Sequence, residues 1–481
     1  MLHHKSTTIV SEINDFFTSS EKSISTILNI LSSLTLSEKQ IGLQSKNNNL
    51  VKNISKLYLL ILFPFFGIKD SWGYASSSLY PVSQHGKDIF YRLLNDSFIN
   101  WRKLAYSINM QIINKTKGCN TDQGNKTPSC LIIDDTDLPK TGRKIEMIGR
   151  IFSHVTGKSI LGFKGLFMGY HDGKSFFALD FSLHGEKGKN TKKPYSLTTK
   201  QLKSRYSKKR TKSTPAAHRK EEYFQSKINQ MIEMIRTAIA KGVRFDYVLV
   251  DSWFTCFALV KFIKTRRIKT QLIGMAKMGK TRYTFNEKAL TAKEIIDRLR
   301  KSKKLKRSKY LSCYYSEAVV DFKGIEVKLF FSKTTKRGKW SVLLTTDLDL
   351  IFEEAYKIYS TRWSIEVFFK ESKQYLHLGK NQSQDFDAQI ASITLSNIQY
   401  NLLALAKRFD GYESLGVLFR NTNAETIELT VAEKIWNLII DILTKIAQLF
   451  EIDTEFLMQK LMTDNERFMK LINYNTLLQA G

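Results

Sequence analysis

The pattern of apolar and polar positions divides the chain into a helical region and a mixed region. Up to about residue 120, apolar residues recur at helical spacing, as in the segment 90–113, so we predict a helical N-terminal region over 1–120. A polar, turn-rich stretch over 118–129 is typical of a boundary. Beyond it the pattern changes to short apolar runs and period-two alternation, which indicate strands.

The region 130–277 is predicted to be the first part of a mixed α/β sheet flanked by helices. Three strands come first, and the second and third form a hairpin around His171-Asp172-Gly173. Helix and strand then alternate, an order typical of parallel strands. The expected strands are 130–135, 159–170, 174–184, 245–251 and 270–276, and the expected helices are 221–242 and 253 to about 267.

The remaining chain is predicted to interrupt this sheet and then complete it. Residues 278–340 carry short alternating runs and indicate a β-rich insertion. The chain returns to the main sheet with a strand at 340–347, so 341–410 forms the second part of the sheet region. Residues 411–481 are predicted to be a helical C-terminal region.

The net charge indicates a polyanionic partner. The chain of 481 residues holds 75 Lys and Arg against 45 Asp and Glu, a formal charge of +30. Such an excess usually serves phosphate binding, although a ribosome or a membrane surface also attracts it. The cysteines, Cys119, Cys130, Cys256 and Cys313, show no zinc spacing and indicate a reducing compartment. The apolar run 57–68 is too short to span a bilayer, and MLHHKSTT lacks a signal core, so we expect an intracellular protein.

Four polar residues are spaced along a strongly apolar segment near residue 359. Taking Tyr359 as zero on an α-helix, Arg362, Glu366 and Lys373 fall at about −60°, −20° and −40°. Because the neighbouring positions are apolar, this stripe is predicted to line a cleft on a buried helix. The alternative is an ion-pair ladder on a solvated helix face.

Carboxylates at the ends of two predicted strands can join this stripe. Asp134 and Asp135 end the first strand, Asp251 ends the strand 245–251 just before a helix, and Glu366 lies on the later helix. Three such carboxylates can hold two Mg²⁺ ions about 3.5–4 Å apart, which suits in-line attack on phosphate. Taken alone, each aspartate could instead be a turn or helix-cap residue.

With these motifs the sequence resembles the DDE transposases of bacterial insertion sequences, in the branch with a Tyr-x2-Arg-x3-Glu-x6-Lys signature. Tyr359, Arg362, Glu366 and Lys373 match that signature without a gap. The family's strand-Asp-Thr motif matches Ile133-Asp134-Asp135-Thr136, and Asp251 matches the second aspartate. We assign the first catalytic position to Asp135, directly before Thr136, with Asp134 as the other candidate.

The resemblance implies a ribonuclease H-like core that depends on two Mg²⁺ or Mn²⁺ ions held by Asp135, Asp251 and Glu366. It further implies cleavage of the terminal inverted repeats of a mobile element and joining of the freed 3′-hydroxyl to target DNA. Tyr359, Arg362 and Lys373 would contact DNA phosphates. A cytoplasmic, nucleoid-associated bacterial protein is the corresponding location.

Other parts of the chain are predicted to contact DNA or a second subunit. The helical N-terminal region 1–120 is the predicted DNA-binding region that recognises the terminal repeats. The basic tracts 192–212, with Lys208, Lys209 and Arg210, and 299–310 are candidate backbone contacts or solvated loops. Trp253 could stack on an extruded base, but a core position is the expectation. A homodimer on paired DNA ends is expected, with the segment from about 425 as candidate contact. The alternatives are a DNA-binding protein without catalysis and a ribonuclease H-fold nuclease without strand transfer.

Overall fold

The protein is described from a computed structural model, which covers residues 23–44, 51–77, 79–80, 85–117, 127–265, 269–410 and 415–423. The chain divides into two compact units. The first comprises Met1–Gln111, Gln374–His377 and Asp387–Gly481, and the second Ile112–Lys373 and Leu378–Phe386. In the parts of the chain covered, we find no helix with the length and apolarity needed to span a membrane. The segment from about 425, our candidate for a subunit contact, lies outside the described residues.

The first unit is helical. Aromatic rings of Phe63, Tyr74 and Phe90 pack together in its core, with centroids 4.9–5.8 Å apart. A buried amide pair, Asn401 Nδ2 to Asn109 Oδ1 at 2.7 Å, joins its two longest helices. Its elements are α2 (Ser23–Ser32), α3 (Glu38–Ile41), α4 (Asn53–Leu62), η1 (Phe63–Phe66), η2 (Gly73–Ser76), α6 (Asp88–Leu94), most of α7 (Trp101–Lys117) and nearly all of α15 (Phe386–Asp410).

The grouping of α15 differs from the expected organisation. The sequence pattern assigns 341–410 to the second part of the sheet region. In the structure, residues from Asp387 onward belong instead to the unit of the N-terminal helices. The reason is packing: Gln399 donates to the carbonyls of Leu60 and Ile61, at 3.0 and 3.2 Å, and its neighbours bury their apolar side chains in the helical core.

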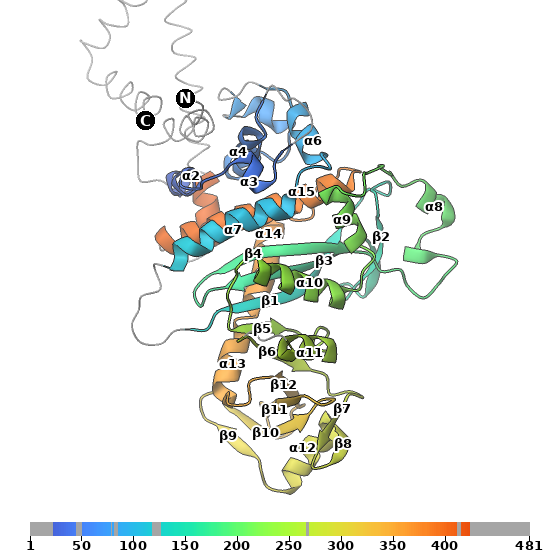
Figure 1. Ribbon diagram of the computed structural model, residues 1–481, viewed down its shortest axis with the longest axis vertical. Helices are drawn as coiled ribbons and strands as arrows, with labels where there is room; N and C mark the ends of the chain where they lie inside the picture. The colour runs from blue at the N-terminus through green and yellow to red at the C-terminus, as the bar shows by residue number, and fades with distance from the viewer. Residues whose placement is uncertain are drawn as a thin grey trace, which may run out of the picture. The chain divides into compact units, whose positions relative to one another are not determined.

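The second unit is built on one mixed sheet of twelve strands (Figure 1). The main path runs β2-β3-β1-β5-β6-β12-β11-β10-β7-β8, while β4 pairs with β3 and β9 with β10. The strands are β1 (Cys130–Pro139), β2 (Gly149–Ser153), β3 (Lys158–His171), β4 (Phe176–His184), β5 (Tyr247–Val250), β6 (Gln271–Ala276), β7 (Arg282–Phe285), β8 (Lys288–Thr291), β9 (Lys306–Ser308), β10 (Cys313–Asp321), β11 (Glu326–Lys333) and β12 (Ser341–Thr345).

Strand directions confirm the predicted mixed α/β sheet. β1 is antiparallel to β3, which is antiparallel to β4, whereas β1, β5 and β6 are parallel. The β3–β4 hairpin turns at His171–Gly173, where Gly173 takes a φ of 97° that favours glycine. β12 returns antiparallel to β6, so the strands of the 278–340 segment extend the same sheet.

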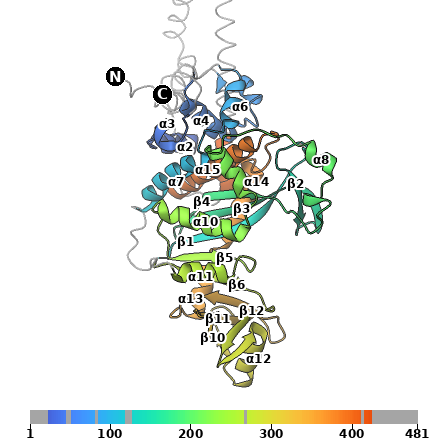
Figure 2. The same cartoon turned by 45° about the vertical axis from the view of Figure 1, so that its right-hand side comes forward.

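Helices cover both faces of the sheet (Figure 1, Figure 2). On one face, Ser182 of β4 contacts Met234 of α10 at 3.9 Å. On the other, Phe368 and Phe369 of α14 pack on Phe167 of β3, with ring centroids 5.7 and 5.4 Å apart. The helices of this unit are η3 (Pro194–Ser196), α8 (Thr199–Lys203), α9 (Pro215–Glu222), α10 (Lys227–Ala240), α11 (Phe257–Thr265), α12 (Ala292–Lys301), α13 (Phe352–Ser360) and α14 (Trp363–Tyr375).

Candidate active site

The register of β1 decides which of its two aspartates faces the helix α14. Paired residues on antiparallel strands share a face of the sheet, and Asp134 pairs with Phe167, which packs against α14. Asp135 pairs with Leu166 and therefore points to the opposite face, the α10 side. Neighbouring residues on one strand cannot both contribute to one site on one face.

Asp251 comes to lie beside Asp134 through the parallel pairing of β1 and β5. Ile133 is in register with Val250, so the next residues are Asp134 on β1 and Asp251 directly beyond the end of β5. Asp251 Oδ1 accepts backbone N–H bonds from Trp253 and Phe254 at 2.9 and 3.1 Å, a turn that fixes this carboxylate. Asp251 thus stabilises the turn after β5 and also lies beside Asp134.

Arg362 joins Asp134 to Glu366. Its Nη1 donates to Asp134 Oδ2 at 2.7 Å, and its Nη2 donates to Glu366 Oε1, one helical turn away. Burial raises the pKa of Asp134 to about 6 against the opposing effect of Arg362, and the charge of Asp251 adds to the rise. Asp134, Asp251 and Glu366 thus bring negative charge together beside β1, and the guanidinium of Arg362 offsets part of it.

The other two residues of the signature also reach the sheet. Tyr359 donates its hydroxyl to the Val250 carbonyl at 3.2 Å, and burial raises its pKa to about 12. Lys373 Nζ donates to Thr136 Oγ1 at 2.6 Å, and burial lowers its pKa. The stripe thus faces β1 and the end of β5, so the solvated ladder is wrong, although Arg362 and Glu366 do pair. The predicted strand end at Asp135 is also wrong, because β1 continues to Pro139 and keeps its pairing with β3 beyond the two aspartates.

The stripe does not lie on one continuous helix. α13 ends at Ser360 and α14 begins at Trp363, with Thr361 and Arg362 forming the connection. The helical angles expected from the spacing apply only within α14, because the chain turns between Tyr359 and Glu366. Contacts to β1 and β5 still direct the side chains to one region.

Asp135, the residue we chose from the sequence, lies apart from this constellation. It forms an ion pair with Lys227 Nζ of α10, on the other side of the sheet. Lys227 Nζ also lies 4.1 Å from the centre of the Trp253 ring. The side chain of Trp253 is 45% exposed, so the expectation of a core tryptophan is wrong.

The three carboxylates do not form a ready metal-binding cluster in this conformation. Within the described residues, no group of three His, Cys, Asp or Glu side chains could hold a metal ion. Arg362 takes up the charge of both Asp134 and Glu366 in this arrangement. The donor chemistry nevertheless suits Mg²⁺, because Mg²⁺ prefers carboxylate oxygens and because Asp134 and Glu366 already share one cation, the guanidinium of Arg362.

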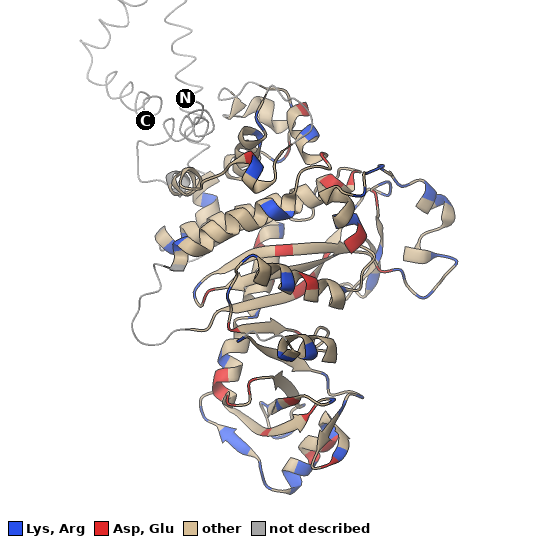
Figure 3. Ribbon diagram, viewed as in Figure 1, with Lys and Arg blue, Asp and Glu red and all other residues tan. Residues whose placement is uncertain are grey.

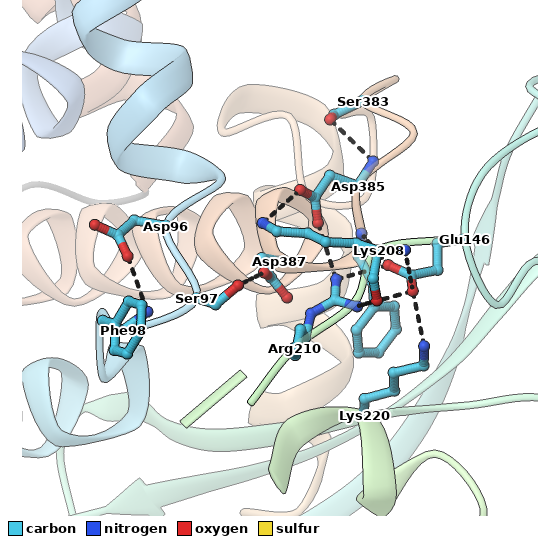
Figure 4. A network of polar contacts seen from close by, with 11 residues as sticks. Asp96, Ser97, Phe98, Glu146, Lys208, Arg210, Lys220, Ser383, Asp385 and Asp387 are labelled. Carbon is cyan, nitrogen blue, oxygen red and sulfur yellow. Dashed lines mark hydrogen bonds and ion pairs between the residues drawn. The ribbon is translucent and has the colours of Figure 1, made fainter. Parts of the chain in front are cut away.

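Two of the three cations predicted to contact DNA in the tract 192–212 instead hold the fold together (Figure 4). Arg210 pairs with Glu146 at 2.6 Å and with Asp385 at 3.1 Å, and its side chain is only 3% exposed. Lys208 pairs with Asp385 at 2.8 Å. The prediction for Arg210 is wrong because a buried guanidinium with two carboxylate partners cannot face a DNA backbone; Lys209 is exposed.

Lys140 is a further residue at this end of β1 that the sequence analysis did not select. It is 6% exposed, and its Nζ donates to the carbonyls of Gly379 and Asn381 at 2.6 and 2.7 Å. It thereby anchors the loop after α14 to the strand that carries Asp134. Lys140 directly follows β1 but lies five residues beyond the strand end predicted from the pattern, so only the fold reveals this role.

Two protein families match the chain. The model described as DDE superfamily endonuclease matches residues 78–272 and supports an endonuclease of that superfamily. The model described as Transposase DDE domain matches residues 225–402. Together the two matches include Asp134, Asp251 and Glu366.

Among solved structures, the chain is similar to one titled "Cryo-EM structure of piggyBac transposase synaptic complex with hairpin DNA (SNHP)". The sequence identity is 16% and the TM-score 0.40, over 87% of this chain and 80% of that chain. No curated protein matches the chain.

Proposed function

We propose that this protein is a DNA transposase that cleaves the ends of an insertion sequence and joins them to target DNA by metal-dependent phosphoryl transfer. The observation that carries the proposal is the adjacency of Asp134 and Asp251 on parallel strands, with Glu366 linked to Asp134 through Arg362. Residues from strand, strand and helix thereby meet at one end of the sheet. The two family matches support the same assignment.

The core of the second unit is proposed to be ribonuclease H-like. The consecutive strands β4-β3-β1-β5-β6 combine an antiparallel trio with two further parallel strands, and this order supports the proposal. The strands β7 to β11 then extend the sheet as an insertion.

Asp134, Asp251 and Glu366 are the proposed metal ligands, with Asp134 in place of Asp135. Bound Mg²⁺ or Mn²⁺ would supply an activated water or 3′-hydroxyl and neutralise charge on the phosphate. Before metal binds, Arg362 offsets the charge of Asp134 and Glu366. If these carboxylates held a metal ion, the guanidinium of Arg362 would be free to bind a DNA phosphate in a planar, bidentate contact.

Lys373 and Tyr359 are proposed to hold DNA at the same end of the sheet. Lys373 is anchored on Thr136, two residues beyond Asp134 and on the same face of β1. Its side chain is only partly buried, so a phosphate that reached it would gain a charge-assisted hydrogen bond. The partner is therefore double-stranded DNA, namely the inverted repeats and the target.

The experiment that tests the assignment compares Asp134→Asn with Asp135→Asn. Both changes remove one charge and keep the shape of the side chain. We expect Asp134→Asn, Asp251→Asn and Glu366→Gln each to reduce cleavage of end DNA by at least about a hundredfold, since each removes a metal ligand. Asp135→Asn should retain cleavage, with end-DNA binding measured in parallel. Full activity of Asp134→Asn would refute the site.

The two alternatives give different outcomes in the same assays. A DNA-binding descendant without catalysis would bind DNA but leave it uncut with Mg²⁺ and with Mn²⁺. A nuclease without strand transfer would cut but would not join a supplied 3′-hydroxyl end to a plasmid. Inverted repeats flanking the reading frame would support the insertion-sequence context.

A further inference from the structure

We infer that the segment 298–310, at the outer end of the insertion, is a binding surface for the phosphate backbone of duplex DNA. We name this segment the insertion edge. The inference rests on the proposed function, because it specifies where the transposase contacts DNA away from the carboxylates. It assigns DNA backbone binding to one of the two basic tracts, 299–310, which composition alone could not distinguish from the tract 192–212.

The charge of the insertion edge is of one sign. Its thirteen residues include eight Lys or Arg and no Asp or Glu. The segment runs from the last turn of α12 through β9 to Tyr310, and every residue from Lys301 to Tyr310 except Ser308 is exposed. Figure 3 shows the basic residues gathered at the end of α12 and on β9. A positive surface of this kind raises the local concentration of a polyanion.

Little of this charge is neutralised within the protein. Arg300 contacts Asp297 at 3.4 Å and Lys306 contacts Glu317 at 2.8 Å, both on the surface. The other basic side chains of the insertion edge form no ion pair with any residue that the structure describes: Arg298, Lys301, Lys303, Lys304, Arg307 and Lys309. Mutual repulsion of adjacent unpaired cations is unfavourable and is relieved when phosphates bind.

The surroundings of these cations favour a nucleic acid over a membrane. A membrane-surface segment would expose a broad apolar face beside its cations. The insertion edge exposes only Leu305, at 38%, and Tyr310, at 75%, among its large apolar or aromatic residues. A single exposed ring beside many cations suits contact with a sugar or base next to a phosphate chain.

The other basic tract supplies a partial contrast, because three of its nine cations hold the fold and the other six are exposed. There Lys208 and Arg210 are paired with Asp385 and Glu146, and Arg205 Nη1 donates to the Ile148 carbonyl at 2.9 Å. Those cations connect three segments of the second unit. The insertion edge makes few comparable contacts, so its charge is available to an external partner.

The test compares two triple variants of the full chain with the same net charge. The first is Lys301→Ala, Lys303→Ala and Lys304→Ala; the control is Lys241→Ala, Lys261→Ala and Lys264→Ala, three exposed lysines on or next to α10 and α11. Binding to a duplex of about 30 base pairs of arbitrary sequence is measured by fluorescence anisotropy in EDTA at several salt concentrations. EDTA separates binding from catalysis.

Each lost phosphate contact flattens the plot of log K against log salt by about 0.9. The slope of the insertion-edge variant should therefore be shallower by up to about 2.7. Between about 50 and 200 mM salt, the loss of affinity of wild type should be up to about forty times as large as the loss of affinity of the variant. The control should keep the wild-type slope. Equal slopes in the two variants, or a larger loss of binding to phosphatidylserine vesicles or duplex RNA than to DNA, would overturn the inference.

The measurements distinguish failure of this inference from failure of the proposed function. Normal cleavage of end DNA with an unchanged slope refutes the insertion edge alone. A flattened slope in a protein that cuts no DNA under any metal condition refutes the transposase and leaves the surface in place.

Discussion

Replacing Glu146 by Gln tests whether the segment around Arg210 supports the fold. Glu146 is 2% exposed and accepts hydrogen bonds from Arg210 at 2.6 and 2.8 Å and from Lys220 at 2.8 Å. Burial alone would raise its pKa, but the hydrogen bonds and charges of Arg210 and Lys220 lower it from 4.5 to about 2. The charged form is therefore strongly favoured by the fold.

The magnitude follows from linkage. Lowering the pKa from 4.5 to about 2 corresponds to at most about 3.4 kcal/mol, and solvent around Lys220, whose side chain is 28% exposed, reduces this to about 2–3 kcal/mol. Because the folded pKa is depressed, this contribution is complete above pH 4.5 and is lost as the pH falls toward 2. Wild type and Glu146→Gln should thus differ by about 2–3 kcal/mol at pH 7 and by less than half of that at about pH 3.

Urea denaturation followed by tryptophan fluorescence measures this difference. The matched control is Glu233→Gln on α10, where Glu233 pairs with Arg236 and both side chains are about half exposed. That change should cost no more than about 0.5 kcal/mol at either pH. A Glu146→Gln protein as stable as the control at pH 7 would show that the buried network contributes nothing and would return Arg210 to the list of candidate DNA contacts.

Two further predictions concern the metal and the assembly. Arg362→Gln should tighten binding of Mn²⁺ in the absence of DNA by about five- to tenfold, because the competing guanidinium is removed. Electron paramagnetic resonance measures this affinity, and an unchanged value would contradict the exchange proposed for Arg362. The same variant should cleave DNA more slowly. For the assembly, light scattering should find mainly monomers without DNA and dimers on paired DNA ends. The reason is that a charge of +30 opposes self-association until DNA phosphates neutralise it. A stable dimer without DNA would contradict this expectation.

The mixed sheet could be predicted because its signal is local. Period-two alternation and the His171-Asp172-Gly173 turn identify the β3–β4 hairpin, and alternating helix and strand identify the parallel part. The choice between Asp134 and Asp135 could not be made from the motif alone, because it depends on which face of β1 is covered by α14. The antiparallel register that pairs Asp134 with Phe167, which packs on α14, contains the missing information.

The ion-pair partners of Arg210 could not be predicted from the sequence for a different reason. Arg210, Glu146 and Asp385 are far apart along the chain, and nothing in a run of basic residues indicates that one of them will be buried. The same holds for α15, whose apolar surface could suit either unit. Its buried amides, Asn401 and Gln399, acquire meaning only through Asn109 and the α4 carbonyls.

The continuity of the sheet has a mechanical consequence. Because β12 lies between β6 and β11, an unbroken ladder of backbone hydrogen bonds runs from β10, next to β9, to β1, which carries Asp134. A load applied at β9 would act across several strands at once, and shearing such a ladder requires many bonds to break together. The insertion is thus a rigid extension of the sheet and not a separate, flexibly linked domain. A force at its outer end would therefore strain the strands next to the carboxylates.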